Sequence, residues 1–168
     1  GVSDPLDGVP AEALDRAHLA QDQLLYVIAS DRKRAGTLQG PVVGTVMSNL
    51  GLEQKLQAEG VEFLRAKVGD RYVLAMLKEH GGVLGGETSG HLLCLDRTTT
   101  GDGLISALEV LAVMKRTGRP LAELVAGMPK LPQVMINVRV KQRIDLSKSQ
   151  AIQDAVKRVE EGLGTTGR

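Results

Sequence analysis

Two hydrophobic periods divide most of this chain into expected helices and strands. From Asp22 the apolar residues Leu24, Leu25, Val27 and Ile28 recur at helical spacing, which predicts a helix that faces a core. Short apolar runs bounded by glycine, proline or charged residues predict buried strands. We expect strands at 41–48, 61–67, 83–87 and 91–95, and further helices at 51–59, 71–80, 102–115 and from Pro120. Such alternation predicts an α/β fold, a three-layer mixed sheet with helices on both faces.

The predicted helices also have expected faces and ends. Asp70 and Asp102 stand where a carboxylate can cap the helix that follows. Arg32, Lys33 and Arg34 end the first helix, where cations favour the helix dipole, and we expect this cluster to be solvated. The residues expected to face the core are Leu52, Leu56, Tyr72, Val73, Met76, Leu77, Ile105, Leu108, Leu111 and Ala112.

The pattern changes after residue 128 and predicts a second domain. Residues 128–132 (MPKLP) are typical of a linker. The alternation from Val134 to Val140 predicts a half-exposed strand, and a helix at 149–161 is expected to turn Ile152, Val156 and Val159 inward. One strand and one helix cannot bury a core alone. We therefore divide the chain into a leader or linker of unclear origin at 1–20, one α/β domain at 21–128 and an incomplete α+β segment at 129–168.

Charge and composition narrow the functional classes. The chain has 21 Lys and Arg against 20 Asp and Glu, a net charge of +1, so no clustered basic face for nucleic acid is expected. With two Tyr, one Phe and no Trp, a stacking platform for bases is nearly excluded. The single cysteine, Cys94, excludes an intrachain disulfide, and its apolar neighbours indicate a small buried hydrophobe. No run approaches the roughly 20 apolar residues that span a bilayer, and no signal peptide is recognisable, so we expect a cytoplasmic protein.

The glycine-rich segment from Gly85 to His91 carries the densest chemistry. It predicts a tight loop between two strands, and the loop would present the carboxylate of Glu87, the hydroxyls of Thr88 and Ser89, and an imidazole. Those groups suit a hydroxyl-rich ligand, because a carboxylate accepts hydrogen bonds and a hydroxyl both donates and accepts them. A hairpin turn with a solvated Glu87 is the alternative, and the residues alone leave both open.

Three other polar segments, at 45–49, 67–71 and 98–103, follow predicted strands. In open α/β sheets, ligands bind outside the carboxyl ends of the strands, so these segments are expected to converge on the edge that carries the glycine-rich loop. Helix capping is the alternative explanation for Asp70 and Asp102. The chain contains no P-loop, GxGxxG, HExxH or GxSxG motif, and its carboxylates lack the spacing of a divalent-cation site. We therefore expect no metal ligand in this chain.

Five segments, in order and at matching spacing, resemble the α-D-phosphohexomutase superfamily and, within it, the bacterial phosphoglucosamine mutases. They are Asp22-Gln23, GTVMSN (44–49), RAKVGDRYV (65–73), GGETSGH (85–91) and LDRTTTGDG (95–103). The resemblance implies that 21–128 is the third domain of such an enzyme and that 129–168 begins the fourth. It also implies an isomerase that interconverts glucosamine 6-phosphate and glucosamine 1-phosphate through a 1,6-bisphosphate, with an enzyme phosphoserine and Mg²⁺ as cofactor.

The same resemblance assigns roles to residues of this chain. Glu87 and Ser89 would bind the sugar hydroxyls, and His91 would lie near the reacting end, where it could help proton transfer. The implied partner is a phosphosugar, with neither nucleic acid nor a membrane, and a homodimer is left open. The residues assigned to the substrate-binding loop and the surrounding cleft are Gly86, Glu87, Thr88, Ser89, Gly90, His91, Asp70 and Lys67.

The chain lacks the other catalytic and substrate-binding motifs of the family. It contains no phosphoserine loop, no DGDGDR metal loop and no SGTEP-type phosphate loop, and Ala20 and Gln21 precede Asp22 where the family has DGDQ. We therefore expect a fragment of a phosphoglucosamine mutase that is inactive alone, with no catalytic phosphoserine and no bound metal. The alternatives are a fragment of a phosphomannomutase or phosphoglucomutase relative, and a non-catalytic interaction module that reuses the fold.

Overall fold

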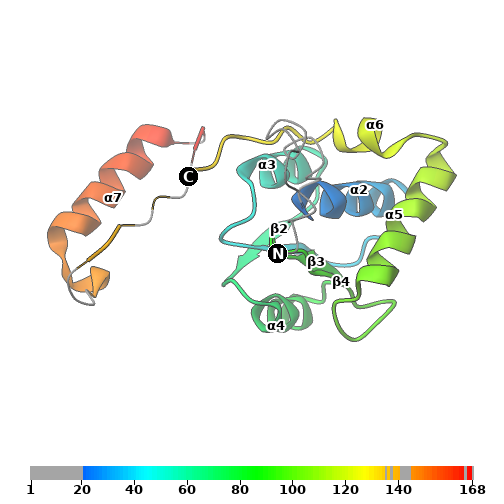
Figure 1. Cartoon of the computed structure of the whole chain (residues 1–168), viewed down its shortest axis with the longest axis horizontal. Helices are drawn as coiled ribbons and strands as arrows, with labels where there is room; N and C mark the ends of the chain where they lie inside the picture. The colour runs from blue at the N-terminus through cyan, green and yellow to red at the C-terminus, as the bar shows by residue number, and fades with distance from the viewer. Residues whose placement is uncertain (1–20, 135, 137, 141–144, 165, 168) are drawn as a thin grey trace, which may run out of the picture. The chain divides into compact units, whose positions relative to one another are not determined.

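The computed structural model describes residues 21–134, 136, 138–140, 145–164 and 166–167 (Figure 1). The chain divides into two compact units, Gly1–Lys130 and Leu131–Arg168. The predicted leader at 1–20 lies outside the described residues.

A four-stranded sheet with the order β2-β1-β3-β4 forms the centre of the first unit. β1 pairs in parallel with β2 and with β3, and β3 pairs antiparallel with β4. Because β1, β2 and β3 run in one direction, the loops that follow them lie at one edge of the sheet. All four predicted strands are present, each shorter than predicted: β1 (Val42–Thr45), β2 (Phe63–Ala66), β3 (Leu84–Gly86) and β4 (Leu92–Cys94).

Helices cover both faces of this sheet, which confirms the three-layer prediction (Figure 1). On one face, α4 packs Val73 and Leu77 against Val43 and Leu93 of the strands. On the other face, α2, α3, α5 and α6 share the larger part of the core with β1, β3 and β4. The bounds of these helices are α2 (Gln21–Arg34), α3 (Leu50–Ala58), α4 (Asp70–His80), α5 (Gly103–Thr117) and α6 (Leu121–Val125).

The core is built mainly from aliphatic side chains, joined by the rings of Tyr26 and Phe63. Leu25, Leu52 and Leu56 are completely buried, and Cys94 is 1% exposed. Burial raises the pKa of the Cys94 thiol to about 11, because the thiolate would lose its hydration. Cys94 therefore behaves as the small hydrophobe that the sequence predicted.

The predicted inward face of α5 is wrong. Leu108 and Leu111 were expected to face the core, yet they are 56% and 55% exposed, whereas Val110 and Val113 are buried. This helix carries apolar residues on two faces, and α2 and β4 cover only one of them. Periodicity finds an apolar stripe but cannot choose between two stripes on the same helix.

Of the two predicted helix caps, one is confirmed and the other is corrected. Asp102 does cap α5, since its carboxylate accepts from the backbone N–H of Leu104 at 2.8 Å and of Ile105 at 3.0 Å. Asp70 does not cap α4: the cap position is Gly69, and Asp70 is the first helical residue. Its carboxylate lies beside His91 instead, as described below.

Arg32 is buried rather than solvated, with a side chain only 7% exposed. Its guanidinium donates hydrogen bonds to the carboxylates of Asp96 and Glu109, each at 3.0 Å. Two carboxylates from later segments therefore draw this arginine inward, which the sequence of α2 could not indicate. Its neighbour Arg34 is 58% exposed, as predicted for the whole cluster.

The second unit contains the 3₁₀ turn η1 (Leu146–Lys148) and the helix α7 (Gln150–Leu163). The strand predicted from Val134 to Val140 is absent among the residues that the structure describes there, and Val134 is 81% exposed. A strand needs a partner strand to satisfy its backbone hydrogen bonds. The described part of this unit supplies no such strand.

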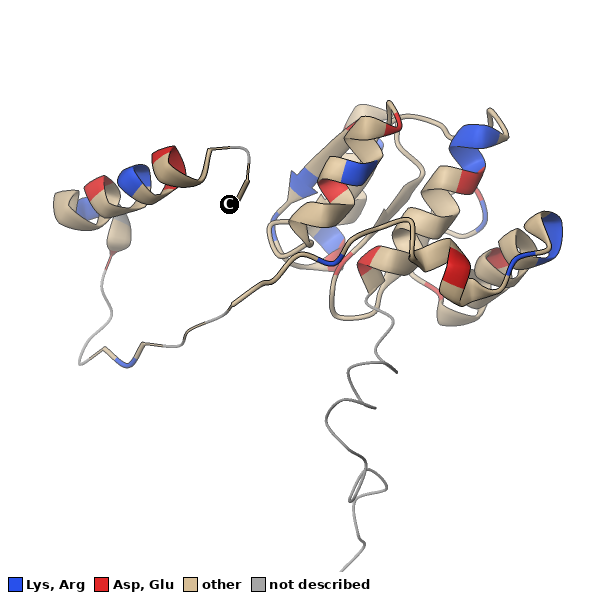
Figure 2. Ribbon diagram, turned by 90° about the horizontal axis from the view of Figure 1, so that it is seen from above, with Lys and Arg blue, Asp and Glu red and all other residues tan. Residues whose placement is uncertain are grey.

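The amphipathic helix α7 forms as predicted, but its apolar face is not buried. Ile152, Val156 and Val159 are 36%, 50% and 59% exposed, which corrects the prediction that they turn inward. The same helix also carries both acidic and basic residues along its length (Figure 2). The predicted linker is also shorter than expected, because Met128 is 2% exposed and belongs to the core of the first unit.

Candidate functional site

The loops that follow β2 and β3 meet at the carboxyl edge of the sheet. The backbone N–H of Gly69, after β2, donates to Oε2 of Glu87, after β3, at 3.0 Å. Gly69 has φ of 123°, a conformation that glycine adopts at little cost, and this directs the turn toward the neighbouring loop. Two of the predicted polar segments therefore converge, as expected for an open α/β sheet.

Glu87 is the buried centre of this site. Its residue is 8% exposed, so the alternative of a solvated hairpin glutamate is wrong. Oε1 accepts from the hydroxyl of Ser89 and lies 3.3 Å from Nδ1 of His91. The Ser89 hydroxyl, followed by the His91 and Gly69 donors, holds the pKa of the Glu87 carboxyl below its ordinary value against the effect of burial.

Asp70 supplies a second carboxylate to the same cluster. Its Oδ2 lies 3.3 Å from Nδ1 of His91, the same distance as Oε1 of Glu87. Burial raises the pKa of Asp70, with a further contribution from the negative charge of Glu87, while His91 acts in the lowering direction. Oδ1 of Asp70 is buried without a hydrogen-bond donor among the described residues.

The remaining predicted residues surround this cluster without joining it. Thr88 and Gly90 are exposed at the loop tip, where Gly90 has φ of 117°. Gly86 ends β3 under the loop, and a Cβ there would meet the side chain of Leu92 at 2.9 Å. Lys67 is exposed, with its ammonium 6.0 Å from the ring centroid of Tyr72.

Two residues that hold the neighbouring loop were missed as site residues. Oδ2 of Asp22 accepts from the backbone N–H of Asn49 at 2.7 Å, and burial raises the pKa of this carboxyl. Arg65 donates to the carbonyl oxygens of Thr45 and Ser48 at 3.0 and 2.8 Å. Both side chains fix the segment after β1 at the same sheet edge, and their spacing in the sequence gives no sign of it.

The donor set of the cluster does not fit Mg²⁺. Asp70, Glu87 and His91 are the one group of three possible ligands among the described residues, with donor atoms within 4.8 Å of one another. Magnesium prefers oxygen ligands in octahedral geometry. Here one donor is an imidazole nitrogen, and both oxygens of Glu87 already accept hydrogen bonds from the protein. We derive no catalytic step through a metal at this position.

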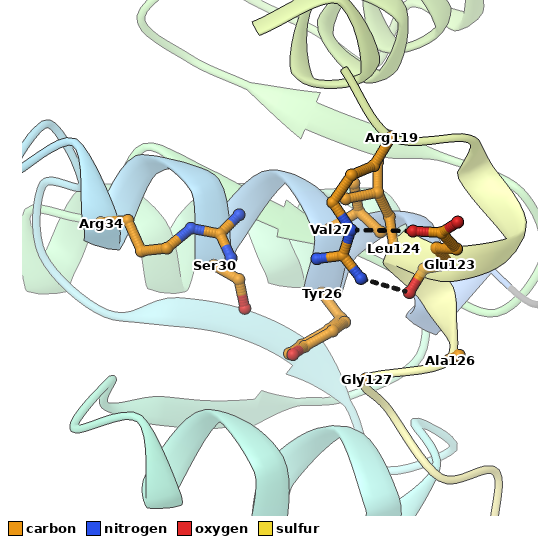
Figure 3. Close-up of a pocket in the computed structure, with 9 residues that line it drawn as sticks. All are labelled: Tyr26, Val27, Ser30, Arg34, Arg119, Glu123, Leu124, Ala126 and Gly127. Carbon is orange, nitrogen blue, oxygen red and sulfur yellow. Dashed lines mark hydrogen bonds and ion pairs between the residues drawn. The ribbon is translucent and has the colours of Figure 1, made fainter. Parts of the chain in front are cut away.

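Two cavities lie close to other elements. A cavity of about 300 Å³ between α2 and α6 contains Tyr26, Ser30, Arg119 and Glu123 (Figure 3). Its polar groups serve one another or the scaffold: Arg119 bonds Glu123 at 3.2 Å, and Tyr26 and Ser30 both donate to Glu59. A second, more apolar cavity of about 370 Å³ lies between α2 and α5 and reaches the loop at Gly90.

Comparison with known proteins decides the family. A family model described as phosphoglucomutase/phosphomannomutase, alpha/beta/alpha domain III, matches residues 20–131, which is more than half of the chain. The chain belongs to this family. The resemblance inferred from the five sequence segments is thereby confirmed, and so is the α/β fold.

Individual members of the phosphoglucomutase/phosphomannomutase family give the same result. The phosphoglucosamine mutase of Alkalilimnicola ehrlichii is 57% identical over 147 residues, which cover 88% of this chain and 33% of that protein. The phosphoglucosamine mutase of Methylococcus capsulatus is 55% identical over the same shares. The chain thus spans about a third of the length of the curated relatives that it matches.

Solved structures place the fold in the same family. A phosphoglucomutase/phosphomannomutase family protein from Burkholderia thailandensis has a TM-score of 0.57 and 27% identity over 66% of this chain and 24% of its own. The N-acetylphosphoglucosamine mutase of Aspergillus fumigatus, solved with GlcNAc-6P and magnesium, has a TM-score of 0.62 over 74% of this chain and 33% of its own. At 17% identity, that likeness concerns the fold alone. No helix in the described part of the chain has the length and apolar character needed to cross a membrane.

Proposed function

We propose that this chain supplies the sugar-hydroxyl recognition loop of a phosphoglucosamine mutase. The observation that supports it best is the Gly69–Glu87 hydrogen bond, because it joins the two segments, KVGD and GETSGH, that resemble the substrate cleft of that family. The relatives that share more than half of its residues bear the name phosphoglucosamine mutase. For the whole protein, the reaction we propose is the interconversion of glucosamine 6-phosphate and glucosamine 1-phosphate.

The geometry suggests how the loop would take a sugar. Oε2 of Glu87 is held by the backbone, whereas Oε1 receives the hydroxyl of Ser89, which is an exposed and rotatable donor. A sugar hydroxyl would replace Ser89 as the donor to Oε1, and Ser89 would then accept from or donate to the adjacent hydroxyl. A buried carboxylate anchored at one oxygen keeps its position during this exchange, so the pair is pre-organised for adjacent hydroxyls.

The magnesium of the Aspergillus relative belongs to the proposal for the whole protein only. The described carboxylates of this chain hold hydrogen bonds rather than an open ligand set, so we assign them to sugar binding. The proposed partner is therefore a phosphosugar, with Glu87 and Ser89 as the residues in contact and His91, Asp70 and Lys67 around the same cleft.

The experiment is an NMR titration of the ¹⁵N-labelled 168-residue chain with glucosamine 6-phosphate. We expect weak, saturable shifts at Glu87–His91 and Gly69, at least several-fold weaker in Glu87→Gln and in Ser89→Ala. Glu123→Gln, which changes an exposed carboxylate on α6, should titrate like the wild type. Shifts that avoid the loop, or that survive Glu87→Gln unchanged, would refute the assignment. Glucose 6-phosphate and mannose 6-phosphate, titrated in parallel, test the alternative hexose specificities.

A further inference from the structure

His91 Nδ1 lies between two carboxylate oxygens, and this arrangement fixes where the ring must carry a proton. Oε1 of Glu87 and Oδ2 of Asp70 each lie 3.3 Å from this nitrogen. An ionised carboxylate can accept hydrogen bonds but cannot donate them. An unprotonated Nδ1 would therefore place its lone pair against those of two carboxylate oxygens, which repel it. The environment therefore favours the proton on Nδ1.

The two carboxylates do not contribute in the same way. Glu87 already accepts from Ser89 and Gly69, and these bonds keep it ionised and fixed in place. Asp70 is more exposed and makes its contact to the imidazole from the first turn of α4. The nearby cations Lys67 and Arg71 both lie against the ring of Tyr72, so neither neutralises Asp70 in the described contacts.

We propose that Asp70 is a positioning residue which, together with Glu87, holds the proton of His91 on Nδ1 and leaves Nε2 as an acceptor for a hydroxyl group of a bound phosphosugar. An acidic group that orients an imidazole and selects its tautomer is a known device for making the opposite nitrogen a base. The side chain of His91 is 57% exposed, so its free nitrogen is accessible to a ligand. The identity of the ligand rests on the proposed function, whereas the tautomer does not.

The contact with the His91 ring also explains why a carboxylate, Asp70, stands in the first turn of α4, which helix capping does not explain. Asp70 makes no side-chain bond to its own helix. It would instead connect α4 to the loop after β3, so that the same imidazole is oriented from two elements that are separate in sequence.

The test reads the tautomer directly from long-range ¹H–¹⁵N spectra of the labelled 168-residue chain, at a pH where the imidazoles are neutral. His91 should show the Nδ1–H form as its major tautomer. His80, the exposed last residue of the same helix, serves as an internal reference and should show the Nε2–H form that isolated imidazoles prefer. In Asp70→Asn, the Nδ1–H to Nε2–H ratio of His91 should fall several-fold, while Asp102→Asn should leave it unchanged.

Either of two results would overturn the proposal: a major Nε2–H form of His91 in the wild type, or an unchanged ratio in Asp70→Asn. If Asp70→Asn loses the native spectrum, Asp70→Ser removes the carboxylate and still suits a helix start. A purely structural role for Asp70 would alter backbone shifts without altering the ratio. Sugar-dependent shifts at Glu87 that persist alongside a failed tautomer test would reject this inference and retain the proposed function.

Discussion

The strongest stability prediction concerns Arg32, whose burial opposes the expectation from its sequence. Its aliphatic stem leaves α2, and its guanidinium bonds Asp96 and Glu109 at 3.0 Å each with 7% of the side chain exposed. Arg32→Met keeps most of the stem and removes only the charge and the donors. The two carboxylates then lose the buried cation that they share, and the more exposed Arg97 is the cation that stays beside both of them.

The structure sets the size of this effect. Breaking a fully buried ion pair costs about 3–5 kcal/mol. Asp96 is 27% exposed, so water can solvate it in part, and Glu109 keeps Arg97 at 3.0 Å as a second partner. We therefore expect Arg32→Met to lower the free energy of unfolding by about 2–3 kcal/mol, below the fully buried limit.

Urea denaturation followed by tyrosine fluorescence measures this loss. The chain has no Trp, and both tyrosines, Tyr26 and Tyr72, lie in the first unit, so the signal reports on that unit alone. With a slope of about 1–3 kcal/mol/M, the midpoint should fall by roughly 0.7–3 M. The matched control is Arg34→Met on the same helix: Arg34 is 58% exposed with its carboxylate partner at 3.9 Å, so its effect should stay within about 0.5 kcal/mol.

Equal midpoints for Arg32→Met and Arg34→Met would refute the reasoning, because they would mean that the burial of Arg32 carries no electrostatic consequence. A double-mutant cycle with Glu109→Gln isolates the pair. We expect a coupling of about 1 kcal/mol or more, since the two side chains are in direct contact and both are at most 14% exposed.

Two further predictions concern Glu87 and a glycine contact. The pKa of Glu87 is lowered in the folded chain, so the stability that its charge contributes is present at neutral pH and is lost as the pH falls through that lowered pKa. The advantage of the wild type over Glu87→Gln in urea midpoint should therefore shrink as the solution is acidified below the ordinary pKa of a glutamate. A pH-independent difference in urea midpoint would contradict this. A Cβ on Gly51 would lie 1.9 Å from the carbonyl oxygen of Pro129, so Gly51→Ala should lower the free energy of unfolding by about 1–3 kcal/mol. Gly103 has open space around it, so the control variant Gly103→Ala should change the urea midpoint little. Similar midpoints for both glycine variants would mean that the segment at Pro129 moves freely.

Much of the first unit could be predicted because its elements follow single-period patterns. Leu52 and Leu56 face the core as expected, since α3 has one apolar stripe and one surface to cover. The face of α5 could not be predicted, because Leu108 and Val110 belong to different stripes and only the position of α2 decides between them. The strand at Val134–Val140 was predicted from alternation, but alternation describes a strand's faces and not its partner.

The site could be predicted in position and only partly in detail. The rule that ligands bind at the carboxyl ends of parallel strands brought the loops after β2 and β3 together, and the Gly69–Glu87 bond agrees with it. Local spacing misread Asp70 as a helix cap, because a carboxylate at that position suits both a cap and a long-range contact. The supports of the β1 loop, Asp22 and Arg65, depend on contacts 27 and 17 residues along the chain, which no motif encodes.

The order of the elements along the chain has a consequence for synthesis. Among the described elements of the first unit, α2 precedes all the others in the chain. Arg32 finds its partners 64 and 77 residues later, and the apolar side of α2 packs in part with β4, α5 and α6. The β3–β4 hairpin closes over a few residues, so it can form as soon as it leaves the ribosome. Elements that emerge earlier, α3 and β3, can pack against part of α2, but the rest of its apolar surface stays uncovered until α5 and α6 have emerged.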